Sequence, residues 1–120
     1  MKVIFLDIDG VLNYTKWYTD ERNPGNLYGQ EGDLDPLCVD RIIRICEETG
    51  AKVVISSDWR ISWYGTQMRL GRMGLDENFV IIDDRTDFTD EQSPHFVHID
   101  PMWGITDKHV EFAIAILNHH

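Results

Sequence analysis

The pattern of hydrophobic and polar positions predicts four short strands. Each is a run of apolar, mostly β-branched or aromatic residues that is bounded by polar residues. The runs cover residues 2–6, 51–57, 78–84 and 95–99. The second run, AKVVISS, is short and β-branched, so we expect that strand to be fully buried.

Three helices are predicted between and after these strands. Asp35, which precedes a proline, is expected to cap the first helix, and Gly50 is expected to end it. A less regular pattern predicts a helix over residues 59–73, and Thr106 is expected to cap a last helix over about 107–118.

The order of these elements predicts the class of fold. Strands and helices alternate, which is typical of an α/β domain with a mostly parallel sheet and helices on both faces. Residues 13–35 follow the first strand without a sustained period and contain Asn-Pro-Gly, so they are expected to form a long loop or small flap. A chain of 120 residues fits one domain over 1–120.

Charge and composition narrow the range of partners. The formal net charge of −10 disfavours tight, extended binding of nucleic acid unless a local basic patch or a metal ion intervenes. The sequence has no apolar run of about 18 residues and no signal-peptide pattern at its start, so we expect no membrane span. Two cysteines that cannot pair with each other favour a cytoplasmic location.

The cysteines and the final histidines carry no expected chemistry. Cys38 and Cys46 lie eight residues apart on one predicted helix, about 12 Å along its axis, which is too far for a disulfide. They are interpreted as small core residues. His119 and His120 resemble the remains of a purification tag and receive no role.

Polar residues stand at the carboxyl ends of three predicted strands. They are Asp7 and Asp9, Ser56 and Ser57, and Asp83 and Asp84. Because the carboxyl ends of parallel strands meet at one edge of a sheet, we expect these side chains to lie together. Four crowded carboxylates repel one another, and a hard divalent cation such as Mg²⁺ relieves that repulsion.

Three motifs resemble those of the haloacid dehalogenase (HAD) superfamily. DIDGVLN is similar to its first motif, VVISS to its second and VIIDD to its fourth, and all three occur in the family's order. The phrases SSDWR and IIDDRTD are most similar to the small HAD domains of polynucleotide kinase–phosphatases and RNA-repair proteins. The resemblance implies a compact Rossmann-like core without a large cap.

The resemblance also implies catalytic roles. Asp7 would be the nucleophile that forms an aspartyl-phosphate. Asp9 would protonate the leaving oxygen and then deprotonate the attacking water, and its backbone carbonyl would bind the metal. Asp83 and Asp84 would complete the Mg²⁺ site, with Asp84 favoured as the direct ligand. Gly10 permits the tight turn after Asp9.

The phosphate-binding residues are less well defined. Ser56 is expected to donate a hydrogen bond to the phosphoryl group, with Ser57 either assisting or capping the next helix. The family's third motif is a lysine that lies between the second and fourth motifs. In this chain the segment between Ser56 and Asp83 is short and contains no lysine. The arginines of that segment, Arg60, Arg69 and Arg72, are candidates to replace it, with Arg60 assigned to the phosphate site.

These inferences predict a Mg²⁺-dependent phosphomonoester hydrolase. Its partner is expected to be a phosphorylated small molecule or a nucleic acid end, since a site without a large cap stays open to large substrates. The alternative is a degenerate HAD module that binds a phosphorylated partner without turnover, and phosphotransfer to an acceptor other than water also stays open.

Two further features concern recognition and assembly. The loop aromatics Tyr14, Trp17, Tyr18 and Tyr28 are expected to stack on a base, pack in the core or form a dimer contact. A strand–helix unit common in the family is missing, which predicts a bare sheet edge and a possible homodimer built near residues 59–73.

Overall fold

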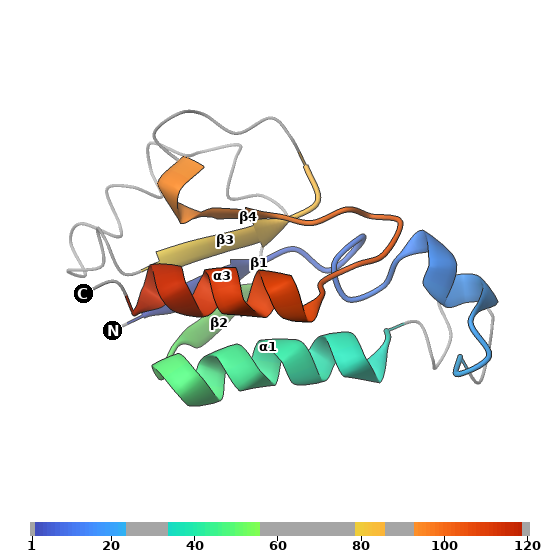
Figure 1. Cartoon of the computed structure of the whole chain (residues 1–120), viewed down its shortest axis with the longest axis horizontal. Helices are drawn as coiled ribbons and strands as arrows, with labels where there is room; N and C mark the ends of the chain where they lie inside the picture. Colours follow the sequence, from blue (N-terminus) through green and yellow to red (C-terminus); the bar gives the residue numbers. More distant parts are fainter. Residues whose placement is uncertain (1, 24–33, 56–78, 86–92, 119–120) are drawn as a thin grey trace.

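The computed structural model describes residues 2–23, 34–55, 79–85 and 93–118. The described strands form a four-stranded parallel sheet in the order β2-β1-β3-β4. Their bounds are β1 Val3–Leu6, β2 Lys52–Ile55, β3 Phe79–Asp83 and β4 Phe96–His98. The α/β class with a parallel sheet is therefore confirmed, and the central strand β1 carries the first motif to the carboxyl edge (Figure 1).

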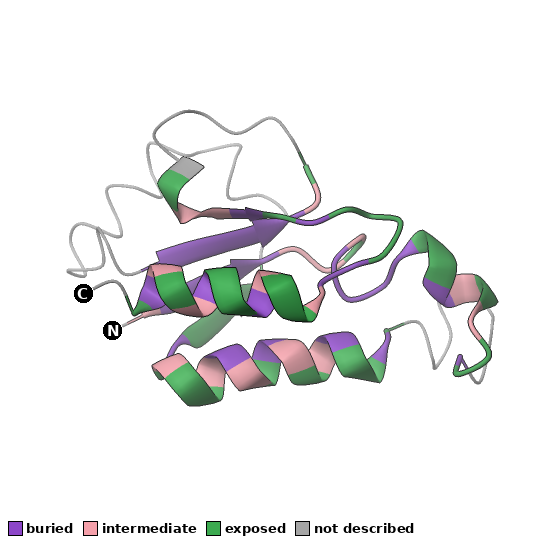
Figure 2. Cartoon of the chain, viewed as in Figure 1, coloured by how far each residue is buried: buried purple, intermediate pink, exposed green. Residues whose placement is uncertain are grey.

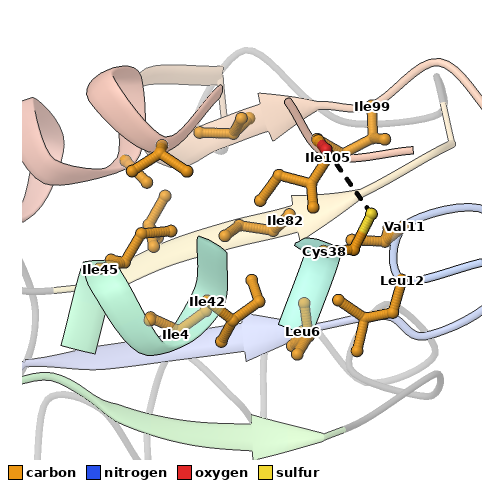
Figure 3. Close-up of a cluster of buried hydrophobic side chains, with 14 of the residues drawn as sticks. Ile4, Leu6, Val11, Leu12, Cys38, Ile42, Ile45, Ile82, Ile99 and Ile105 are labelled. Atoms are coloured by element: carbon orange, nitrogen blue, oxygen red, sulfur yellow. Dashed lines mark hydrogen bonds between the residues drawn. The ribbon is translucent and has the colours of Figure 1, made fainter. Parts of the chain in front are cut away.

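Helices α1 (Pro36–Thr49) and α3 (Asp107–Leu117) pack together on one face of this sheet (Figure 1). Their buried side chains meet inward-facing residues of β1, β3 and β4 in one apolar cluster. Figure 3 shows Ile42 and Ile45 of α1 directed at Ile4 and Ile82 of the strands, with Cys38 beside Ile105. Cys38 is buried and Cys46 partly buried, and both are free thiols, in agreement with the core role expected for them.

The ends of α1 follow directly from the sequence. The Asp35 carboxylate accepts a hydrogen bond from the Leu37 backbone N–H at 3.0 Å, which satisfies one of the unpaired donors of the first turn. At the other end Gly50 adopts a left-handed conformation with φ of 76°. The predicted cap and stop are thus confirmed.

The opposite face of the sheet also carries buried side chains. Val3, Phe5, Phe79 and Ile81 form a second apolar cluster, in which the Phe5 and Phe79 rings meet edge to face. Figure 2 shows β1 and β3 buried along their lengths. Both described helices lie on the first face, and the helix predicted over 59–73, like the dimer contact proposed there, falls outside the described residues.

Strand β2 corrects the expectation that the AKVVISS run is fully buried. All four of its residues are exposed, and Ile55 reaches 66% exposure. The reason is its place in the sheet, because among the described strands β2 has one neighbour, β1. A β-branched run fits an edge strand as well as a central one, so the pattern alone did not separate the two positions.

The first part of the flap, predicted over 13–35, is a short 3₁₀ helix, η1 (Thr15–Thr19), held by a polar cluster. The buried Asp35 accepts hydrogen bonds from the Tyr14 hydroxyl at 2.5 Å and from the Arg22 guanidinium at 2.9 Å. Trp17 is fully buried beneath Arg22, whose guanidinium lies 5.3 Å from its ring centre. The residue that caps α1 therefore also fixes the start of the flap.

A turn at residues 100–104 supports the flap from the other side. The backbone N–H groups of Thr15 and Lys16 donate to the carbonyls of Pro101 and Met102 at 3.0 and 3.2 Å. Gly104 has a φ of 70°, and a Cβ there would lie 2.7 Å from the Tyr14 ring. Only glycine lets the turn approach the flap this closely.

Candidate active site

The pairing of β1 with β3 brings three acids together at the carboxyl edge of the sheet. Asp7 directly follows β1, Asp83 is the last residue of β3, and Asp84 comes next. Since Leu6 pairs with Ile82 in parallel register, Asp7 lies level with Asp83. Each of the three acids offers a carboxylate oxygen, and these atoms all lie within 4.8 Å of one another.

The crowding of these acids changes their protonation. Burial, followed by the negative charge of Asp83 and the hydrogen bond to Asp84, raises the pKa of Asp7 to about 7. Burial and the adjoining Asp83 raise the pKa of Asp84 as well. A cation would offset both effects, and hard oxygen donors are the ligands that Mg²⁺ prefers. The residues present therefore fit a divalent metal ion, which the acidic group could hold.

Gly10 allows this acidic group to form. Its φ is 83°, which confirms the tight turn expected after Asp9. A Cβ at this position would lie 2.2 Å from an Asp84 carboxylate oxygen. The glycine is therefore needed for two reasons, its backbone conformation and the close approach of the turn to Asp84. The close approach was not evident from the motif.

Asp9 lies beside the acidic group and is exposed. Its carboxylate accepts a hydrogen bond from the Asn13 side-chain amide at 3.1 Å. The Asn13 side-chain oxygen in turn accepts from the Gly10 backbone N–H at 2.8 Å, and Asn13 is only 4% exposed. Asn13 was not among the residues expected at the site, although a polar residue beside the apolar positions that follow Gly10 was a usable signal.

A cleft of about 530 Å³ opens next to these residues. Its walls include Asp9, Asn13, Thr15, Tyr18, Asp84 and Pro101. The cleft thus joins one of the three acids, the candidate proton donor and the flap. A molecule with a phosphate at the acids would place the rest of its structure against the flap and the 100–104 turn.

The four loop aromatics lie in different parts of the structure. Tyr14 and Trp17 are 8% and 0% exposed, so both pack in the core, which was one of the expected alternatives, although Tyr14 also lines the cleft. Tyr18 is partly buried and lines the cleft, where it can meet a substrate. Tyr28 lies outside the described residues.

The expected phosphate-binding residues fall in a part of the chain that the structure does not describe. Ser56, Ser57 and Arg60 belong to it, as do the other two candidate arginines, so their roles stay predictions. The role of the Asp9 carbonyl as a metal ligand is also still a prediction.

Two histidines contact backbone carbonyls, one at each end of β3. A ring nitrogen of His95 lies 3.0 Å from the Phe79 carbonyl oxygen, and one of His98 lies 3.1 Å from that of Asp84. The His98 contact ties β4 to the loop that carries Asp84. This position gives His98 a supporting role for that loop.

Comparisons with known proteins give a family for this chain but no individual relative. Among the described residues, no helix has the length and apolar character needed to cross a bilayer. No curated protein and no solved structure matches the chain. A family model described as "HAD domain in Swiss Army Knife RNA repair proteins" matches residues 3–76, which is more than half of the sequence.

Proposed function

This chain belongs to the family of HAD domains found in Swiss Army Knife RNA repair proteins, and on that premise we propose that it is a Mg²⁺-dependent phosphomonoester hydrolase. The match ends at residue 76, before Asp83 and Asp84. The observation that carries the proposal is therefore the structural one, the group of three acids whose carboxylate oxygens lie within 4.8 Å of one another.

Asp7 is the proposed nucleophile. One of its carboxylate oxygens forms a bond to phosphorus while the bond from phosphorus to the leaving oxygen breaks, which gives an aspartyl-phosphate. The step needs an ionised Asp7, and the raised pKa of Asp7, about 7, disfavours that state when no cation is present. A divalent cation held by Asp7, Asp83 and Asp84 would supply the positive charge that keeps these acids ionised and offsets the charge of the phosphate.

Asp9 is the proposed proton donor and acceptor. It gives a proton to the leaving oxygen as the first bond breaks, and it then takes a proton from the water that attacks the aspartyl-phosphate. Its position on the cleft wall supports this role, because the leaving group must lie in the cleft when the phosphate lies at the acids.

The surroundings of the cleft support a nucleotide or nucleic acid end as the substrate. Tyr18 lines the cleft, and Trp103 lies on the adjoining 100–104 turn, 56% exposed, with the Lys16 ammonium 5.8 Å from its ring centre. Aromatic side chains beside a cation suit a base and its backbone phosphate. The net charge of −10 limits such contacts to the end of a strand.

A phosphatase screen tests the proposal. Phosphate release is measured with Mg²⁺ and with EDTA for nucleotides, oligonucleotides with 3′- or 5′-phosphate ends, and sugar phosphates. We expect release from nucleotides or oligonucleotide ends that requires Mg²⁺ and is lost in Asp7→Asn. Binding of a phosphorylated ligand without any release would instead favour the non-catalytic module, for which the missing third-motif lysine is the motivation.

A further inference from the structure

We propose that Asn13 is a positioning residue that fixes the orientation of the Asp9 carboxyl group for proton transfer. The inference rests on the proposed function, in which Asp9 exchanges a proton with the leaving group. It is carried by two hydrogen bonds of the Asn13 side chain and by its burial.

The first hydrogen bond fixes which way the Asn13 amide faces. A backbone N–H can only donate, so the atom that receives the Gly10 N–H at 2.8 Å must be the side-chain oxygen of Asn13. The amide nitrogen then faces the Asp9 Oδ1 atom, 3.1 Å away. Asn13 is only 4% exposed, so water does not replace Asp9 as the partner of this amide.

The second hydrogen bond restricts an otherwise free side chain. Asp9 is exposed, and an exposed carboxyl group has several staggered orientations open to it. The Asn13 N–H selects the orientation in which Oδ1 accepts. A carboxyl oxygen that accepts this bond is the poorer site for the acid's own proton, so the geometry assigns proton transfer to Oδ2.

The turn that carries both residues is itself well fixed. The backbone N–H groups of Val11 and Leu12 both donate to the Ile8 carbonyl, at 3.1 and 2.9 Å. Asn13 therefore stands on a rigid turn four residues after Asp9 and begins the flap whose side chains line the cleft. Its side chain connects the proton donor with the wall that holds the leaving group.

A series of leaving groups tests this role. A good leaving group departs as an anion and needs no acid, whereas an alkoxide of a nucleoside needs the proton. For Asn13→Ala we expect kcat/KM to change by less than about 3-fold with p-nitrophenyl phosphate and to fall about 10- to 100-fold with a nucleotide. Equal losses with both substrates would overturn the inference, because a merely structural role affects both alike.

A matched control is available in the same segment. Asn23 is also buried, at 7% exposure, and its side-chain amide donates to the Trp17 carbonyl at 3.3 Å, away from the acids. Asn23→Ala should lower stability without any dependence on the leaving group. A leaving-group effect in Asn23→Ala as large as that in Asn13→Ala would count against a specific role for Asn13.

A measurement without turnover separates this inference from the proposed function. Melting temperatures of Asn13→Ala, Asp9→Ala and the double variant are compared in EDTA, and we expect the double variant to lose less than the sum of the single losses. Additive losses would overturn the contact whether or not any substrate is hydrolysed. A parent protein that releases no phosphate from any substrate would refute the proposed function instead.

Discussion

The backbone N–H of Asp7 donates to the carbonyl of Ile82 at 3.0 Å. This hydrogen bond is the last link between β1 and β3, and the acids stand immediately beyond it. The proposed nucleophile is therefore held by the sheet itself and not by a loop, so a substitution of its side chain should leave the backbone around it in place.

Asp7→Asn should abolish turnover while preserving the fold. The amide is nearly the same shape as the carboxyl group but is a poor nucleophile, so we expect phosphate release to fall by roughly 10³-fold or more. Without metal the variant should melt at a higher temperature than the parent, because one member of a repelling group is neutral. Full activity in Asp7→Asn would contradict the covalent mechanism.

Mg²⁺ should raise the melting temperature of the parent protein, because the three acids come together only in the folded state. At a concentration 100 times the Kd the gain is about 2.7 kcal/mol. Asp84→Ala should remove the effect, while Asp40→Ala, an exposed acid on α1, should retain it. The site would be refuted by a parent melting curve that does not move at millimolar Mg²⁺.

Gly10→Ala should lose the Mg²⁺ effect as well. Its Cβ would overlap the Asp84 carboxylate at 2.2 Å and so displace a proposed metal ligand. Gly50→Ala is a matched control, since Gly50 also has a positive φ but nothing lies within 4 Å of its Cβ position. Both variants should lose about 1 kcal/mol of stability from backbone strain. An equal Mg²⁺ response in the two would contradict the role of Gly10 in metal binding.

Asp35→Ala should destabilise the protein by about 2–4 kcal/mol, because it removes a helix cap and hydrogen bonds from two side chains. Arg44→Ala, which breaks exposed ion pairs to Glu48 and Glu111, should have little effect on stability because water and salt screen such pairs. Urea unfolding at pH 7 measures both. A loss no larger in Asp35→Ala than in Arg44→Ala would show that the flap is not anchored there.

Asp35 should also make stability depend on pH. Burial alone would raise its pKa, but hydrogen bonds from Tyr14, Arg22 and the Leu37 N–H outweigh burial and leave the pKa lowered. Its stabilising contribution is therefore complete above the ordinary value of 3.8 and is lost as the pH falls through the lower pKa of the folded state. Unfolding curves below pH 4 should show this loss in the parent and not in Asp35→Ala.

Trp103→Ala should reveal the length of the substrate. Loss of one base-stacking contact is expected to lower kcat/KM about 10-fold for a phosphorylated oligonucleotide and to leave a mononucleotide nearly unaffected. Phe112→Ala is the control, because Phe112 is also exposed and carries a lysine, Lys108, over its ring. If the two variants behave alike on oligonucleotides, Trp103 does not contact the strand.

Local patterns in the sequence predicted the parts of the structure that local chemistry decides. The cap at Asp35, the stop at Gly50 and the convergence of Asp7 with Asp83 and Asp84 all follow from residue type and strand order. The exposure of β2 did not follow, because burial of a strand depends on its position in the sheet.

Contacts between distant segments were beyond the reach of these patterns. Tyr14 is buried because Asp35, far along the chain, accepts its hydroxyl hydrogen bond and Gly104 admits its ring. The same limit hid the approach of Gly10 to Asp84. Among such contacts between distant segments, the meeting of the acids was predicted, since the polarity of a strand end is visible in the sequence itself.

The central place of β1 has a consequence for the making of the protein on the ribosome. Both strands that flank β1, β2 and β3, follow it in the chain, and two of the three acids come with the later one. A nascent chain that ends before residue 84 therefore lacks part of the acidic group, however well its first half has folded. The ability to capture a metal ion should arise only after residue 84 has been synthesised and in a single step, as β3 pairs with a strand synthesised long before it.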